Sequence, residues 1–435
     1  MRETPILPFP RFIIIRARAR RAWRPVTALL SCGCVALAGC GGGGSSGNPG
    51  STAAKVAIQP MSTGYFSDPY PIHTVTPNSA STVPAFSGTT KQLLTCAGSL
   101  QPNCFTGTAM TIDGSAFAAQ ATAAGTSISG FENLNVYQDS SGAWQMAVTA
   151  HIAGPSTNPP NQRSWNVILH ASPGPANPST GIPTAWVADA VLKGKIGAWG
   201  QANYDGKYVE DSGTLYLVYS GVMADQTNGI MAQAMQSATV AASSAPVPLL
   251  GDETSNGGYN SELFYGLGSG KTYKQIETGN ITKVQGKYVM TYSVGGYNQP
   301  DYKAGIAWSD HFLPTTAGAY YKRAQKLDTA GVWGQPNHAE VAYLLQSQEA
   351  QWPNYVADQV LAPGVPSIVS DTGGQTYLVF AGYAPSDAPT QDGLYIGSHR
   401  RPYYVRLNVQ IPPNATVDGT AAQDLTNWVQ PVTSP

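Results

Sequence analysis

Four stretches of this chain share one layout, and this repetition restricts the possible folds more than any other feature of the sequence. Each stretch contains a short strand, a turn and a second strand rich in apolar residues, which is the pattern of a β-hairpin. The four copies occupy residues 132–149, 205–220, 277–293 and 365–380. An all-β unit that recurs about every 70 to 90 residues predicts small sheets arranged radially, which is a β-propeller.

The first residue of each copy is expected to lie close to the propeller axis. It stands four positions before a β-branched residue; the pairs are Glu132 with Val136, Asp205 with Val209, Glu277 with Ile281 and Val365 with Val369. Equivalent positions of successive blades converge near the axis, so three carboxylates are predicted to meet there. Residues 400–409 and part of residues 51–130 are expected to form a further blade that closes the ring. The predicted fold is an all-β, five-bladed β-propeller of four-stranded antiparallel blades.

The composition supports many short strands joined by loops. The 435 residues include 47 Gly, 33 Pro and 23 Tyr, and only 11% are charged. Gly and Pro are typical of turns, whereas Tyr and β-branched residues favour strands. The formal net charge is −1, so no overall field would attract nucleic acid, and no such partner is expected.

Residues 1–40 have the features of a bacterial lipoprotein signal peptide. An arginine-rich start is followed by an apolar run from Val26 to Leu37, as in secretory signals. The run ends in a Leu-Ala-Gly-Cys sequence that resembles a lipobox with Cys40 as the acylated residue; an ordinary cleaved signal is the alternative. Residues 41–55 then form a Gly/Ser-rich tether, and residues 56–435 are predicted to be one propeller domain. We expect a protein of the bacterial cell envelope that contacts the outer membrane only through its lipid anchor and faces the periplasm or the cell surface.

Two cysteines remain after the signal peptide, Cys96 and Cys104. An exported protein folds in an oxidising compartment, so these two are predicted to form a disulfide. No His lies near them in the sequence, which argues against a metal site. A short helix is expected over residues 117–124.

Glu132, Asp205 and Glu277 could together hydrolyse a glycosidic bond. This reaction needs a carboxylic acid that protonates the leaving oxygen and a carboxylate that activates water or attacks carbon. A third carboxylate can raise the pKa of the acid, so that the acid keeps its proton near neutral pH. Each residue taken alone is more simply explained as a strand-end acid that caps a turn. Their matching positions in three successive repeats argue for a common site.

The same segments resemble glycoside hydrolase family 43, whose members are five-bladed propellers that act on arabinose- and xylose-containing glycans. The resemblance is carried by Asp205-Gly-Lys-Tyr-Val, by Glu277-Thr-Gly-Asn-Ile and by residues 362–369, within a region of similarity from 130 to 405. It implies Glu277 as the acid, Asp205 as the residue that modulates its pKa and Glu132 as the base. It also implies inversion of the anomeric centre, with about 6.5–9.5 Å between acid and base.

Two positions depart from the pattern of this family. Glu132 and Asn133 stand where the family has Asp-Pro, and the longer Glu side chain would hold the attacking water differently. Val365 stands where the family has a His that orders the centre of the site. Family members often hold a calcium ion on the axis; the loss of this His leaves a structural calcium open here, and no other cofactor or metal ligand is predicted.

Four aromatic residues are candidate platforms for sugar rings, because the apolar faces of sugars stack on Trp and Tyr. They are Trp199, Tyr297, Trp308 and Trp333. Each could instead fill space between blades, since aromatic residues dominate burial in such folds.

Three hypotheses for function follow. The first is a hydrolase of arabinose/xylose-type poly- or oligosaccharides. The two departures from the family pattern would also fit a non-catalytic glycan-binding propeller on a lipid anchor. The third is a fructan-active propeller enzyme with a retaining mechanism, which is disfavoured because the sequence has no Arg-Asp-Pro segment. In each case the expected partner is a carbohydrate, and a monomer is expected.

Overall fold

The computed structural model describes most of the chain after residue 54. The described ranges are 55–74, 85–96, 100–159, 162–175, 180–222, 228–251, 263–266, 271–313, 320–322, 324–326, 339–341, 343–348, 350, 354–371, 373–412 and 428–434. Residues 1–40 with Cys40, nearly all of the predicted tether and Trp333 lie outside these ranges, so the predictions for them stay predictions.

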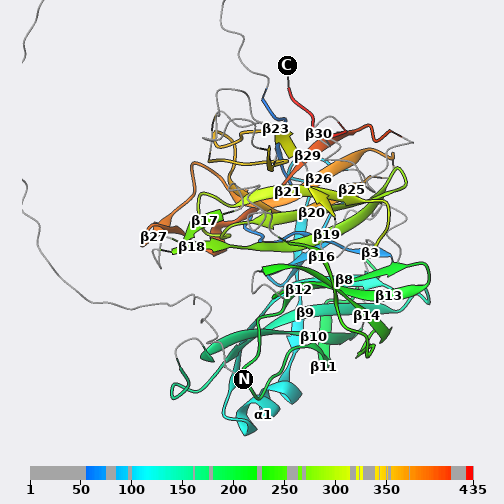
Figure 1. The fold of residues 1–435 in the computed structure, drawn as a ribbon, viewed down its shortest axis with the longest axis vertical. Helices are drawn as coiled ribbons and strands as arrows, with labels where there is room; N and C mark the ends of the chain where they lie inside the picture. Colours follow the sequence, from blue (N-terminus) through cyan, green and yellow to red (C-terminus); the bar gives the residue numbers. More distant parts are fainter. Residues whose placement is uncertain are drawn as a thin grey trace, which may run out of the picture.

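Five sheets, here named blades I to V in chain order, make up a five-bladed β-propeller (Figure 1). Blade I contains β2 (Tyr70–Pro71), β4 (Ala85–Gly88), β5 (Gln92–Thr95) and β6 (Thr106–Ala109). Blade II contains β8 (Ser127–Gln138), β9 (Trp144–Ala153), β10 (Ser164–Pro173) and β11 (Ala185–Lys193), with β3 (His73–Thr74) and β7 (Thr111–Asp113) added in parallel at its two edges. Blade III contains β12 (Tyr204–Asp211), β13 (Thr214–Val222) and β14 (Asn228–Ser237), and β14 also pairs with β15 (Val240–Ala241) and β16 (Val247–Leu250).

The last two blades follow the same order. Blade IV contains β19 (Ile276–Val284), β20 (Lys287–Val294), β21 (Lys303–Ser309) and β22 (Tyr321–Lys322). Blade V contains β25 (Leu361–Ser370), β26 (Thr376–Tyr383), β29 (Arg401–Val409), β1 (Gln59–Pro60) and β30 (Val429–Pro431). Three two-stranded sheets and a short 3-10 helix decorate them: β17 (Leu263–Gly266) with β18 (Lys271–Lys274), β23 (Ala324–Lys326) with β24 (Ala339–Val341), β27 (Thr390–Gln391) with β28 (Leu394–Tyr395), and η4 (Gly397–His399).

Apolar side chains of neighbouring blades form the core between them. Ile306 and Trp308 of β21, for example, pack in one buried cluster with Ile368, Leu378 and Val405 of blade V. Because successive side chains of a strand point to opposite faces, a blade can bury one face against the preceding blade and the other face against the following blade.

Both ends of the described chain complete blade V. β1 pairs with β29, with Gln59 opposite Tyr404, and β30 pairs with the same strand. The blue start and the red end of the described chain lie together at the top of Figure 1. The predicted count of five blades and the predicted contact between the two ends are confirmed. The closing blade was assigned wrongly: the ends complete the blade of the fourth repeat, and β2, β4, β5 and β6 form blade I by themselves.

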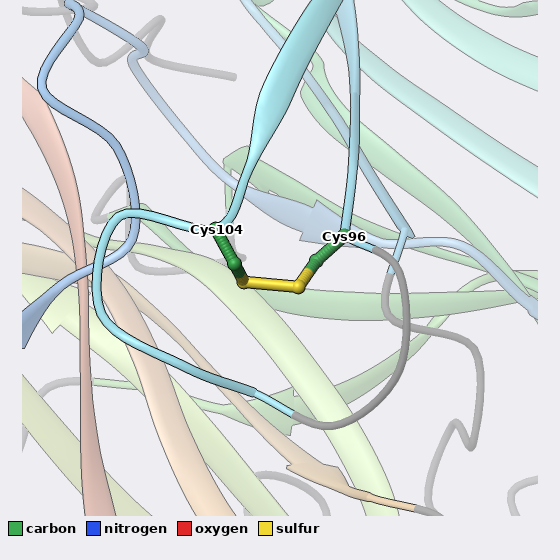
Figure 2. The surroundings of a disulfide bond; sticks show 2 residues. All are labelled: Cys96 and Cys104. Carbon is green, nitrogen blue, oxygen red and sulfur yellow. A yellow bond between two sulfur atoms is a disulfide. The ribbon is translucent and has the colours of Figure 1, made fainter.

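The predicted disulfide closes the β5–β6 hairpin of blade I (Figure 2). Cys96 directly follows β5, Cys104 lies just before β6, and their Cα atoms are 5.4 Å apart. The strands of this blade have only two to four residues each. A cross-link over so short a loop removes chain entropy from the unfolded state and is worth about 2–3 kcal/mol, so it offsets the small number of backbone hydrogen bonds in blade I.

The predicted short helix is present as α1 (Ser115–Ala123), at the lower end of the view in Figure 1. It packs through Ala121 into the apolar cluster of blade II. No helix among the described residues is long and apolar enough to cross a membrane.

The innermost strands of blades II to V each contain a β-bulge at the same place. Within each bulge stands a non-glycine residue with positive φ: Asn133 (51°), Asp205 (56°), Thr278 (58°) and Val365 (53°). Asp68, which stands two residues before β2 of blade I, has φ 60°. A left-handed backbone costs a non-glycine residue on the order of 1–3 kcal/mol, so its recurrence at five matching positions shows that the fold imposes it.

Side-chain hydroxyls tie four of these residues to the preceding blade, and we call these contacts the hydroxyl links. The backbone N–H groups of Asn133, Asp205, Thr278 and Val365 donate to the hydroxyls of Thr89 (3.1 Å), Thr149 (3.1 Å), Ser220 (3.0 Å) and Ser293 (2.8 Å), respectively. Each link joins the innermost strand of one blade to the neighbouring blade, and so fixes the relative height of the two blades along the axis.

Removal of one hydroxyl link should destabilise the fold measurably. In Ser293→Ala the buried N–H of Val365 loses its acceptor, which is expected to cost about 1–3 kcal/mol of unfolding free energy. Urea unfolding would measure this loss. Ser237→Ala, which removes an exposed hydroxyl at the end of β14, is the control and should change stability by less than about 0.5 kcal/mol. Equal effects of the two substitutions would contradict a structural role for the link.

Candidate active site

Four carboxylates from blades I to IV influence one another at the centre of the ring. Asp68, Asp205 and Glu277 are buried, whereas 27% of the Glu132 side chain is exposed. The charges of the other three all act on Asp205. The three acids singled out in the sequence are therefore in one cluster, together with a fourth acid, Asp68, that was not singled out.

Asp205 lies at the centre of this cluster. Its carboxylate accepts hydrogen bonds from the hydroxyls of Tyr70 (3.0 Å) and Ser220 (3.2 Å). Burial raises the pKa of Asp205 to about 7, against the opposing charge of Lys207 and with a further contribution from Glu277. Both of its protonation states are therefore accessible near neutral pH.

Glu277 is held by three neutral donors. Its Oε1 accepts a hydrogen bond from the Tyr302 hydroxyl (2.7 Å), and its Oε2 accepts from Gln275 (2.6 Å) and from the Tyr204 hydroxyl (3.2 Å). Burial raises the pKa of Glu277, and the hydrogen bonds oppose this rise because they favour the charged form. The net direction is upward, which suits a group that must carry a proton at neutral pH.

Asp68 is the functional candidate that sequence reasoning missed. The Thr89 hydroxyl donates to its Oδ2 (2.6 Å), and the guanidinium of Arg400 forms an ion pair with its Oδ1 (2.5 Å). Asp68 precedes Pro69, so the Asp-Pro pair expected of the resembled family is present in blade I. This pair was the available signal, but it lies outside the four repeats because β2 is too short to form a recognisable hairpin.

Arg400 connects this acid to blade V and to the acid in blade IV. The guanidinium is buried, donates to the carbonyl of Ala381 (3.4 Å) and lies over the ring of Tyr302, 5.4 Å from its centroid. Burial lowers the pKa of Arg400, but the effects of Asp68, Tyr302, Tyr383 and Tyr70 together outweigh burial and leave the pKa above its ordinary value. A fixed positive charge therefore lies against Asp68.

Glu132 lies at the partly exposed edge of the cluster. His151 Nε2 is 2.8 Å from its Oε2, and the Asn166 amide donates to its Oε1 (3.3 Å). Burial lowers the pKa of His151, but the hydrogen bond and charge of Glu132 outweigh burial, and the net direction is upward. The pair presents a carboxylate and an imidazole that solvent can reach.

The predicted alignment of the repeats was wrong by one residue in blades III and V, where Asp205 and Val365 are themselves the left-handed residues. The residues that carry the linking hydroxyls are paired across the strands as follows: Thr149 is opposite Glu132, Ser220 is opposite Tyr204, and Ser293 is opposite Glu277. Tyr204 is thus equivalent to the two glutamates, and Asp205 is equivalent to the next residue, which has positive φ. The error arose because Val209 was matched to the β-branched residues of the other copies, whereas its neighbour Tyr208 occupies that register.

Three of the four predicted aromatic platforms are among the described residues, and their surroundings differ. Tyr297 is 44% exposed; partial burial and then the charges of Glu132 and Asp68 raise its pKa, so it lies within electrostatic reach of the acids. Trp199 is 41% exposed in the loop between β11 and β12. Trp308 is a correction: it is fully buried, with its ring 5.1 Å from that of Trp428, so no sugar can reach it. It faces blade V from β21 and fills the space between two blades.

A calcium ion does not fit the donors present. Among the described residues no group of three or more His, Cys, Asp or Glu side chains is placed to hold a metal ion. Val365, at the position of the family His, is buried and has no donor atom in its side chain. Instead, two positively charged side chains, Lys207 and Arg400, lie beside acids of the cluster.

Comparison with known proteins identifies the fold. No family model matches the sequence, and no related curated protein is found. An α-L-arabinofuranosidase from Lactobacillus brevis matches the structure with a TM-score of 0.52 and 13% sequence identity over 82% of this chain and 95% of that chain. The chain has the fold of this arabinofuranosidase.

Other solved structures match somewhat less well. A GH43 endo-arabinanase from Bacillus licheniformis has a TM-score of 0.49 and 12% identity, over 86% of this chain and 99% of that one. A thermostable family-43 glycoside hydrolase has a TM-score of 0.48 and 16% identity, over 88% and 99% of the two chains. At such identities the activity of this chain must be argued from its own residues.

The hydrogen bond from Tyr302 should hold down the pKa of Glu277. Tyr302→Phe removes a donor to the charged form and is expected to raise this pKa by about 1 pH unit. Packing is kept, since the ring lies so close to Gly364 that an added Cβ there would be 2.0 Å from its Cε1 atom. Infrared titration of the carboxyl C=O stretch, assigned with Glu277→Gln, measures the change.

Tyr383→Phe is the matched control, because the Tyr383 hydroxyl donates to the backbone carbonyl of Tyr297 and not to an acid. It should leave the pKa of Glu277 in place. An unchanged or lowered value in Tyr302→Phe would contradict the assigned hydrogen bond.

Proposed function

We propose that the protein is a glycosidase that hydrolyses arabinose/xylose-type poly- or oligosaccharides with inversion. The observation that carries this proposal is the contrast between two buried acids of one cluster. Within the described part of the chain Glu277 has three neutral hydrogen-bond donors and a raised pKa, whereas Asp68 lies against the guanidinium of Arg400. Different surroundings for two nearby carboxyl groups are the usual basis for an acid and a base.

In the proposed reaction Glu277 acts first as a proton donor. It gives its proton to the glycosidic oxygen while the bond from that oxygen to the anomeric carbon breaks. Asp68 takes a proton from a water molecule whose oxygen attacks the same carbon from the opposite face. One displacement forms the new C–O bond, so the product has the inverted configuration. Asp205 tunes the pair, since its charge and that of Glu277 influence each other.

Asp68 is proposed as the base in place of Glu132. Burial is the largest cause of the raised pKa of Glu277, and the charge of Asp68 adds a smaller contribution in the same direction, so the two acids lie within electrostatic reach of each other. Glu132 is engaged by His151 and Asn166 at the exposed edge, which suits contacts with sugar hydroxyls.

The proposed sugar class rests on the fold shared with an arabinofuranosidase and on the resemblance of the segments around Asp205 and Glu277. Tyr297 is the proposed stacking platform because it is exposed and lies within electrostatic reach of the acids, and Trp199 is a second.

Substitution of the three acids should separate their roles. On aryl α-L-arabinofuranosides and β-xylosides, Glu277→Gln and Asp68→Asn are each expected to lower kcat about 10²–10⁴-fold, because general acid and base catalysis contribute this much. Glu132→Gln should mainly raise KM, with a loss in kcat below about 10-fold. The anomer formed first, followed by proton NMR, should be the inverted one.

Glu210→Gln, near the far end of β12, is the control that should keep full activity. A kcat loss in Glu132→Gln as large as in Glu277→Gln, with Asp68→Asn still active, would return the base role to Glu132. A wild-type protein that binds these sugars and turns over no arabinoside, xyloside, galactoside or fructoside would replace the hydrolase with a glycan-binding propeller.

We further propose, from the sequence of residues 1–50 alone, that the enzyme is lipid-anchored in the bacterial cell envelope. Cells that express the full chain should incorporate labelled palmitate into it, and Cys40→Ser should abolish the label while the propeller still folds. Equal labelling of both forms would exclude Cys40 as the lipid attachment site.

A further inference from the structure

Lys207 is a buried lysine in direct contact with the acid cluster. It is 4% exposed and stands on β12, two residues after Asp205. Its Nζ donates to the backbone carbonyl of Asp205 (3.4 Å) and lies 4.7 Å from the centre of the Tyr70 ring. The Tyr70 hydroxyl in turn donates to Asp205 Oδ1 (3.0 Å), so these three residues form a closed set of contacts.

The charge of Lys207 is shared by acids of three blades. Asp205 of blade III, Asp68 of blade I and Glu277 of blade IV all act on it, and Glu132 of blade II acts on Asp205. An ammonium that interacts with three of the five blades lies near the middle of the ring. Burial lowers the pKa of Lys207 to about 8, while the three acids oppose the change, so the group is mainly charged at neutral pH.

The matching positions of the other blades carry no charge. Each stands two residues after the left-handed residue of its blade; they are Tyr70, Asn135, Asn280 and Ser367, and all are buried. Asn135 Oδ1 and Ser367 Oγ have no hydrogen-bond partner within the described part of the chain. These two oxygens can accept hydrogen bonds from the Lys207 ammonium, directly or through water. A divalent cation at the same level of the axis would be repelled by that ammonium.

We infer that Lys207 is the resident cation of the site: its ammonium takes the place of an axial metal ion and positions Asp205 and Tyr70 for the reaction. The kinetic part of this inference rests on the proposed glycosidase function, and the structural part does not. Lys207 is a positioning residue, because its contacts are to Asp205 and Tyr70 and not to the reacting atoms.

Three lysine variants test the positioning role. Lys207→Met keeps the length of the side chain without its charge; kcat should fall about 10–100-fold, while KM changes less than about threefold. Because Lys207 lowers the pKa of Asp205, its loss should raise that pKa. Asp205 tunes Glu277 through its negative charge, so the enzyme is active with Asp205 ionised, and the acidic limb of kcat/KM should move to higher pH. Lys207→Arg should recover most of the wild-type kcat and return the acidic limb of kcat/KM to its wild-type pH. Lys283→Met is the matched control, since Lys283 also lies over a tyrosine ring, that of Tyr288 at 4.9 Å, and is outside the cluster.

Two measurements remain informative even if the wild type hydrolyses no sugar or Lys207→Met fails to fold. Wild-type protein purified without chelator should contain far less than one calcium per chain, and its Tm should be the same in EDTA and in millimolar calcium. The infrared titration should show a higher carboxyl pKa for Asp205 in Lys207→Met than in wild type. One calcium ion per chain, or a rise in Tm with calcium, would overturn the inference. So would an acidic limb of kcat/KM and an Asp205 pKa that are the same in Lys207→Met and in wild type.

Discussion

The hydrogen bond from a left-handed backbone N–H to a hydroxyl of the preceding blade is the contact on which the rest of this structure depends. A bulge turns one backbone unit out of the strand ladder, and in a buried position that N–H needs another acceptor. The Ser or Thr of the neighbouring blade supplies it. Each of the four acids either has a left-handed backbone itself, as Asp68 and Asp205 do, or directly precedes a left-handed residue. The strained backbone therefore aims the carboxylates at the axis.

The junction between blades V and I is built differently. There the contact between blades is an ion pair, in which Arg400 binds Asp68 and also donates to Ala381 of β26. Backbone hydrogen bonds from Met61 and Phe66 to blade V run beside it. Ring closure and the proposed base therefore share one buried guanidinium, and a defect in closure would reach the chemistry directly. Removal of one partner of this buried ion pair would leave an unpaired buried charge and destabilise the junction.

The repeat of the hairpin was enough to predict the propeller, four of its blades and the gathering of Asp205 and Glu277, because strand periodicity and spacing are local properties. The linking hydroxyls were visible too, as Thr149, Ser220 and Ser293 at the ends of three copies, but nothing local reveals which blade they contact. Matching of β-branched residues shifted the register of blade III by one, because Tyr208 occupies that place there, and short strands hid blade I. These two effects explain the misplaced register at Asp205 and the omission of Asp68.

Charge balance explains why one acid of the cluster should hold a proton. Among the described residues Arg400 lies against Asp68, His151 against Glu132 and Lys207 beside Asp205. All three hydrogen-bond donors to Glu277 are neutral. An unbalanced negative charge in a buried site is costly, and protonation of the carboxyl removes it. The residue without a cation of its own is thus the one that can deliver a proton, and this follows from the partners of four side chains before any sugar is considered.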